Sequence, residues 1–174
     1  MPTELRGAIA LRKALRKFEP DLAKETTAQI GNFLKPVVKQ ARGFVPADDS
    51  IPSGWLKGNQ KGKWENRAYN AVEVKRGITY KTTPSKTNRR GFRSLASIFN
   101  KSAAGAIYET AGRKSGVVGR FSPRLKGELV GHGQKMTGRA IFRAYDEDQG
   151  KAKAAVFKAI EKAAMKFEAR GKNV

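Results

Sequence analysis

The chain has 174 residues, with 36 Lys and Arg against 15 Asp and Glu, so its formal net charge is +21. This length fits a single domain, and we expect one α+β domain over residues 1–174. With no Cys and one His, the sequence excludes disulfides, a thiolate nucleophile, Cys-based metal sites and any site that needs two imidazoles.

The amino-terminal region, residues 1–44, is predicted to be helical. Apolar residues recur at helical spacing over residues 5–18, and cations that include Arg12 occupy the remaining face. A second helix is predicted over residues 20–43, because Pro suits a first helical turn and Gly ends a helix. Pro36 lies inside this segment and is expected to kink or split the helix.

Residues 45–68 contain Pro, Gly and several cations and are typical of a loop. Residues 69–83 then alternate apolar and polar side chains, which predicts a β-hairpin with Gly77 in its turn. The sheet is therefore placed in the region 69–111.

A second basic loop is predicted over residues 84–93. Residues 95–99 fit either a strand or the beginning of a helix that runs through Tyr108, and periodicity over so few residues leaves both alternatives open. Residues 112–138 are rich in Gly, Lys and Arg and indicate a long loop.

The carboxy-terminal region, residues 139–171, is predicted to be helical. An Ala-rich apolar stripe indicates a helix over residues 151–170, which Gly171 ends. The acidic run 146–148 is expected to stabilise the beginning of that helix. The elements predict an α+β fold with N-terminal helices, a small antiparallel β-sheet with long basic loops, and a C-terminal helix packed on the sheet.

Positive charge is concentrated in residues 81–143, where fourteen Lys and Arg face two Glu, a net charge of +12. Such charge predicts an acidic neighbour, either nucleic acid held by its phosphates or an acidic protein. The candidate contact residues are Arg89, Arg90, Arg93, Arg113, Lys114, Arg120, Arg124 and Lys126, together with Lys57, Lys61 and Lys63 in the preceding loop.

Two tryptophans, Trp55 and Trp64, lie among the cations of the loop 55–69. This interleaving is found in platforms that stack single-stranded bases, although tryptophans more often anchor a core. The sequence has no motif of a base-reading module, so recognition of a specific nucleotide sequence is not expected.

No group of residues predicts catalysis. The acids at 146–148 are adjacent in sequence, and a metal cage needs ligands from other segments. His132 lacks a second imidazole, and no phosphate-binding Gly-Lys-Ser/Thr triplet or nucleophile elbow occurs. We expect no enzyme activity, no cofactor, no metal and no small-molecule substrate. No apolar run suits a signal peptide or a membrane span.

Several short motifs follow one another in a recognisable order: Val45-Pro46, then SGWLK at 53–57, AIYETAG at 106–112 and MTGRA at 136–140. In this order the chain resembles the tail-completion or neck proteins of long-tailed double-stranded DNA phages. The residues that match the family pattern are Pro46, Gly54 and Leu56 in the first passage, and Tyr108, Glu109 and Gly112 in the second. The spacing between Glu109 and Gly112 and the basic insertion at 112–135 depart from that pattern.

The resemblance implies a virion protein that forms a homo-oligomeric ring, a hexamer, where the tail meets the head. Its partners would be copies of itself, tail-tube or tail-terminator proteins, the head connector and, by non-specific contact, the genome DNA. During assembly it would reside in the host cytoplasm. A free nucleic-acid-binding protein explains the charge equally well, and a lytic factor acting on anionic membranes is a weaker alternative.

Overall fold

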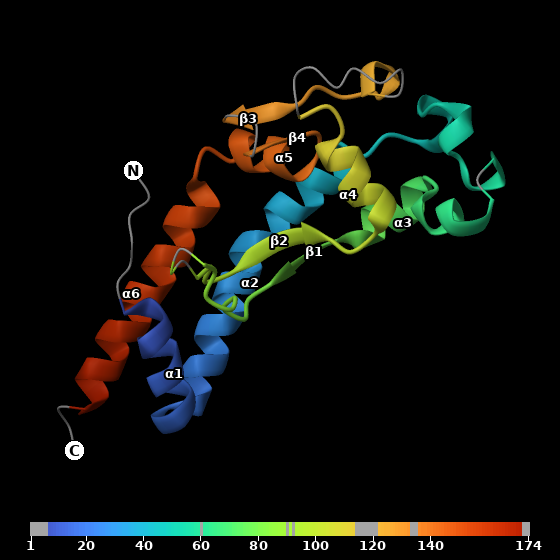
Figure 1. Ribbon diagram of the computed structural model, residues 1–174. Coiled ribbons are helices and arrows are strands. Elements are labelled where there is room, and N and C mark those ends of the chain that lie inside the picture. Colours follow the sequence, from blue (N-terminus) through green and yellow to red (C-terminus); the bar gives the residue numbers. More distant parts are fainter. Residues whose placement is uncertain are drawn as a thin grey trace. The chain divides into compact units, whose positions relative to one another are not determined.

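Figure 1 shows the computed structural model, which describes residues 7–59, 61–89, 91, 93–113, 122–132 and 136–171. The helices are α1 (Ala8–Phe18), α2 (Pro20–Gly43), α3 (Ala71–Gly77), α4 (Ala103–Thr110), α5 (Ile141–Glu147) and α6 (Lys151–Gly171). The strands are β1 (Ile78–Lys81), β2 (Ser97–Asn100), β3 (Val130–His132) and β4 (Met136–Gly138). The fold is α+β and mostly helical, as the sequence predicts.

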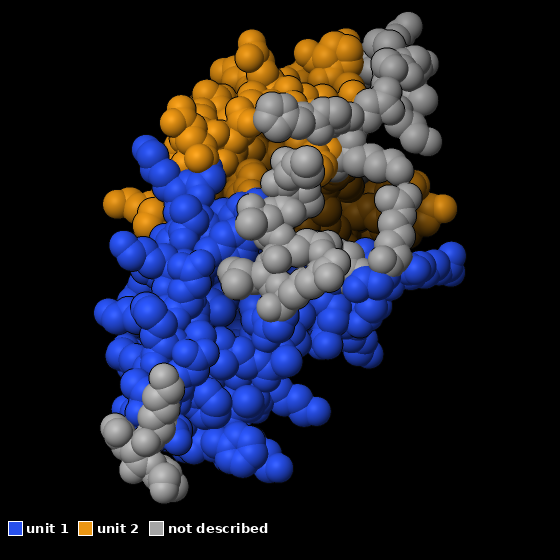
Figure 2. Space-filling model, turned by 90° about the vertical axis from the view of Figure 1, so that its left-hand side faces the viewer, with its two compact units in different colours: residues 1–35, 80–97, 150–174 blue, residues 36–79, 98–149 orange. Residues whose placement is uncertain are grey.

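The chain forms two compact units, which have different colours in Figure 2. Unit 1 holds residues 1–35, 80–97 and 150–174, and unit 2 holds residues 36–79 and 98–149. Helix α2 and strands β1 and β2 contribute residues to both units. A single domain remains a prediction, since two compact units also occur within one domain.

Unit 1 is built from α1, the first part of α2 and α6, which lie side by side in Figure 1. Their apolar faces make two small cores, one around Ile30 and Ile160 and one around Leu15 and Leu22. The helix predicted at the carboxy terminus is confirmed as α6. On the surface, Lys166 on α6 donates a 2.8 Å hydrogen bond to Glu25, and this bond lowers the pKa of the Glu25 carboxyl.

One cation of α1 lies where the sequence pattern did not place it. Arg12 was assigned to the polar face of the helix, but only 5% of it is exposed. Its Nη1 donates to the carbonyl oxygen of Leu95 at 3.2 Å. Burial, and after it the charge of Arg16, lowers the pKa of Arg12. The guanidinium is therefore held in the interior of unit 1, so the assignment to the polar face is wrong.

The second helix is confirmed with its predicted bounds, but Pro36 does not split it. Proline removes one intrahelical hydrogen bond, because its nitrogen carries no hydrogen. The turn that follows packs Val37, Val38 and Ala41 into the core of unit 2, with exposures of 1%, 5% and 0%. We attribute the continuity of the helix to this burial, which offsets the missing bond.

The predicted hairpin over residues 69–83 is wrong in its first half, since residues 71–77 form helix α3. The Asn70 side chain accepts a hydrogen bond from the backbone N–H of Glu73 and caps the helix. Val74 is buried whereas 62% of Val72 is exposed, so the alternation is that of a helix with one buried face. Within residues 69–83 only β1 is a strand, and it pairs with β2.

Residues 97–108 combine both alternatives left open by the sequence, because strand β2 is followed by helix α4. Asn100 at their junction donates from Nδ2 to the carbonyl oxygen of Val74 and accepts from the backbone N–H and hydroxyl of Ser102. Its amide lies between Gly77 and Gly105, where an added Cβ would come within 2.2 Å and 2.1 Å of the Asn100 side chain. Both positions therefore require glycine because of space.

The end of the predicted loop 112–138 contains an antiparallel hairpin, with Val130 opposite Gly138 and His132 opposite Met136. Gly131 has a φ of +125°, and a Cβ there would meet the carbonyl oxygen of Met136 at 2.1 Å. Helix α5 follows this hairpin, and the acidic run 146–148 lies at the end of α5. It still precedes α6, which begins at Lys151, so its stabilising effect on that helix stays a prediction.

Candidate functional site

A buried, hydrogen-bonded polar cluster lies inside unit 2, around Glu109 of α4. This side chain is 6% exposed, and its carboxylate accepts the backbone N–H of Ala140 and of Phe142, each at 2.9 Å. These N–H groups belong to the first turn of α5, where the helix has no internal acceptors for them. Glu109 thus fixes the beginning of α5 to the end of α4.

Arg139 is the buried cation of the same cluster. Its guanidinium donates to the carbonyl oxygens of Tyr108 at 3.0 Å, Ala111 at 2.6 Å and Gly127 at 3.1 Å. Burial lowers its pKa, while the nearby Tyr108 and Glu109 act in the opposite direction. A planar cation with several donors suits three carbonyl oxygens from different segments, so Arg139 holds α4 and the segment before β3 together.

Two tyrosines complete the cluster. The hydroxyl of Tyr108 donates to the carbonyl oxygen of Lys126 at 2.9 Å, and that of Tyr69 donates to the carbonyl oxygen of Pro46 at 2.6 Å. Their rings lie 6.2 Å apart. Burial raises the pKa of Tyr108 to about 12 and raises that of Tyr69 further. Both phenols are therefore neutral hydrogen-bond donors at ordinary pH.

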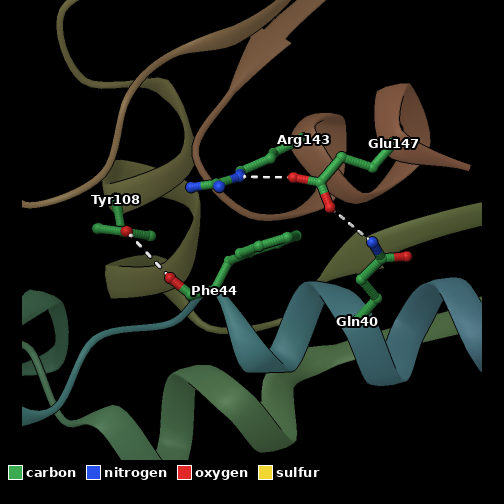
Figure 3. A network of polar contacts seen from close by, with 5 residues as sticks. All are labelled: Gln40, Phe44, Tyr108, Arg143 and Glu147. Atoms are coloured by element: carbon green, nitrogen blue, oxygen red, sulfur yellow. Dashed lines mark hydrogen bonds and ion pairs between the residues drawn. The ribbon is translucent and has the colours of Figure 1, made fainter.

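The rim of the cluster is the network of Figure 3, where Arg143 lies over the ring of Phe44. The guanidinium is 4.2 Å from the ring centroid, and its Nε donates to Glu147 at 2.9 Å. The other carboxylate oxygen of Glu147 accepts from Gln40 at 2.7 Å. Figure 3 also shows the Tyr108 hydroxyl directed at the carbonyl oxygen of Phe44, 3.3 Å away.

The residues of the family pattern have mostly structural surroundings. Pro46 receives the hydroxyl of Tyr69, and Leu56 forms a parallel bridge with Tyr69. Gly112 follows α4 with a φ of +84°, a conformation that favours glycine. Gly54 is exposed, and a Cβ there would meet no atom within 4 Å.

The sequence patterns gave Tyr69, Arg139 and Arg143 no role in a buried cluster, although the first two hold it together and Arg143 lies at its rim. Arg139 lies in the quoted MTGRA motif, so the signal was present. Tyr69 lies at the beginning of the predicted hairpin, and that prediction does not indicate that its side chain is buried.

The predicted cationic residues do not gather in one unit. Arg89 and Arg93 are exposed on unit 1, whereas Lys57, Lys61, Lys63, Arg124 and Lys126 are exposed on unit 2. Arg113 is half-buried, with its guanidinium 4.8 Å from the ring centroid of Phe142. Arg90, Lys114 and Arg120 lie outside the described residues.

The two tryptophans have different surroundings. Trp55 is buried and its indole N–H donates to the carbonyl oxygen of Arg67 at 2.7 Å, so it anchors the core. Trp64 is 49% exposed and lies next to Lys63 and Arg67. The interpretation as a core anchor is confirmed for Trp55, and a stacking role for Trp64 stays a prediction.

Within the described ranges, no group of three or more His, Asp or Glu side chains is placed to hold a metal ion. The same part of the chain contains no helix that is both long and apolar enough to cross a membrane. No protein-family model, no curated protein and no solved structure matches this chain.

Proposed function

We propose that the chain is a non-enzymatic structural protein, a ring-forming subunit of the neck of a long-tailed DNA phage. In this role it completes the tail and joins it to the head connector. The observation that carries the proposal is the burial of its motifs. Tyr108, Glu109 and Arg139, from two motifs thirty residues apart in the chain, bond to each other's segments and to backbone groups. Such motifs specify a scaffold, and their polar groups are already used within the fold.

Exposed cations support a position beside DNA. Lys57, Lys61 and Lys63 are exposed, and none forms an ion pair within the part of the chain that the structure describes. Cations of this kind bind phosphates without reading sequence, because each contact releases counterions from the nucleic acid. A subunit that flanks a DNA passage gains from this property, and the charge keeps isolated copies apart.

Exposed apolar side chains support contacts with other subunits. Val72 and Tyr145 on unit 2 are 62% and 45% exposed, and Phe18 on unit 1 is 63% exposed. Burying such side chains against a neighbour is favourable by roughly 25 cal/mol per Å² of apolar surface. The partners proposed are further copies of the chain in a hexameric ring, the tail-tube or tail-terminator protein, and the head connector.

Size-exclusion chromatography with light scattering tests this proposal on the full chain. The chain is run in about 100 mM and about 500 mM salt, with and without a non-specific DNA duplex. A discrete ring, or a monomer that ignores the duplex, is the expected result, because the ring subunit needs its neighbours to hold DNA.

A free nucleic-acid-binding protein is the second candidate, and the net charge of +21 favours it. It predicts that a monomer elutes with the duplex at low salt and separates from it at high salt. That result would replace the neck proposal with this alternative.

A further inference from the structure

The loop over residues 56–67 in unit 2 carries an exposed aromatic side chain among cations and has no role in the buried cluster. It contains Lys57, Lys61, Lys63 and Arg67 against Glu65, a net charge of +3. All five of these side chains are exposed, and Trp64 lies among them. Nothing in the proposed ring requires an exposed indole at this place.

The base of the loop is fixed to the core. The indole N–H of Trp55 donates to the carbonyl oxygen of Arg67, and the N–H of Tyr69 donates to the carbonyl oxygen of Trp55, both at 2.7 Å. The rings of Trp55 and Tyr69 are 5.0 Å apart. These contacts join the two ends of the loop, so its exposed residues are presented from a closed base. A ligand then meets a preformed surface and loses less to ordering of the backbone.

Local geometry places two of the cations, Lys63 and Arg67, beside the indole. Residues 62–67 form a 3₁₀ helix, which Gly62 enters with a φ of +64°. In such a helix side chains three positions apart lie one above the other, which places Arg67 over Trp64. The guanidinium carbon of Arg67 is 5.0 Å and the Lys63 Nζ 5.4 Å from the ring centroid. Trp64 as a whole remains 49% exposed.

We propose that this loop, the Trp64 loop, is a binding site for single-stranded nucleic acid. Trp64 stacks on a base, and Lys57, Lys61 and Lys63 bind the adjacent phosphates. This chemistry uses both features of the loop, because every base has a π-face and every linkage carries a charge. A duplex keeps its bases stacked on each other and offers the indole no face. An acidic peptide pairs with the lysines but leaves the indole half exposed to water.

Fluorescence titration with an oligothymidylate of about twelve nucleotides tests the site, since such proteins occupy about 4–16 nucleotides. In the intact chain Trp64 supplies the signal, and the buried Trp55 gives a constant background. Variants that lack Trp64 are measured by the fluorescence anisotropy of the same oligothymidylate carrying a dye, and the intact chain is measured in both ways. We expect quenching on binding by the intact chain. Trp64→Ala is expected to weaken binding about 5- to 150-fold, because one stacked base contributes about 1–3 kcal/mol. Met165→Ala, which removes an exposed apolar side chain of α6 in unit 1, is the control and is expected to leave binding unchanged.

A charge series separates the lysines of the loop from the general charge of the protein. The triple variant Lys57/Lys61/Lys63→Ala is expected to reduce the slope of log K against log salt by about 2, at about 0.7 per phosphate. The matched triple variant Lys75/Lys81/Lys101→Ala removes three other exposed lysines and is expected to keep the slope.

Three results would overturn the inference. They are equal binding by the intact chain and the Trp64→Ala variant, an equal fall in slope for the two triple variants, and equal quenching by a polyglutamate peptide of the same length. The last result would identify an acidic protein segment as the occupant. None of these results bears on ring formation, so the site and the neck proposal fail independently.

Discussion

Replacing Glu109 with Gln should destabilise the protein far more than its small change in volume implies. The carboxylate accepts the backbone N–H groups of Ala140 and Phe142 at the beginning of α5, each at 2.9 Å, and its charge acts on the buried Arg139. An amide in its place presents N–H₂ to one of those donors. That donor is then buried without an acceptor, and the interior loses a negative charge that favours the charged form of Arg139.

The magnitude follows mainly from the lost acceptor. Glu109 and Arg139 each bond to backbone groups, and a buried donor without an acceptor costs about 1–3 kcal/mol. We therefore expect Glu109→Gln to lower the free energy of unfolding by about 1–3 kcal/mol. For a chain of this size the melting temperature should fall by about 2–12 °C.

Urea unfolding followed by circular dichroism at neutral pH measures this effect. Glu128→Gln makes the same chemical change at an exposed position of unit 2 and serves as the control. It should alter the free energy of unfolding by less than about 0.5 kcal/mol. If the two variants were equally stable, Glu109 would not hold α5, and the account of the cluster would be refuted.

Two further predictions concern the same unit. Because burial raises the pKa of Tyr108 from 10.0 to about 12, the unfolded chain loses this proton first. Stability is then full below pH 10 and falls by up to about 1.4 kcal/mol per pH unit as the pH rises to about 12. Tyr108→Phe should make the decline measured by urea unfolding across this range less steep, and an unchanged slope would contradict the argument. Arg143→Gln removes the contact with Phe44 and the ion pair with Glu147. In that ion pair the Arg143 side chain is 36% exposed and the Glu147 side chain 40%. Thermal unfolding should show a loss of only about 1 kcal/mol, since partial exposure weakens both contacts, and a loss above about 3 kcal/mol would indicate a larger role.

The long helices were predictable because their signals are redundant. In α2 and α6 an apolar stripe, good helix formers and terminal Pro or Gly agree with one another over more than twenty residues. The segment 71–77 is too short for such agreement, and the alternation of Val72 and Val74 with charged residues resembles the pattern of a strand. The pair Asn70 and Glu73 at capping distance was the signal that identifies a helix there.

The candidate site was predictable only in part. The motifs contain Tyr108, Glu109 and Arg139. Sequence alone does not show that Glu109 and Arg139 are buried, or that each bonds to a residue 31 positions away in the chain. Burial of a charge depends on acceptors and donors supplied by other segments, which periodicity does not report. The exposure of Trp64 and the burial of Trp55 depend in the same way on which indole the fold encloses.

The junction of β2 and α4 has a consequence for how this sequence can change over generations. The amide of Asn100 fills the space that side chains at Gly77 and Gly105 would need, and its hydrogen bonds to Val74 and Ser102 keep it there. A mutation at either glycine meets a neighbour that cannot withdraw. A mutation at Asn100 first leaves a gap between two backbones, and only then gives the glycines room to vary. Substitution of Gly77 or Gly105 is therefore expected only after Asn100 has been replaced by a smaller residue.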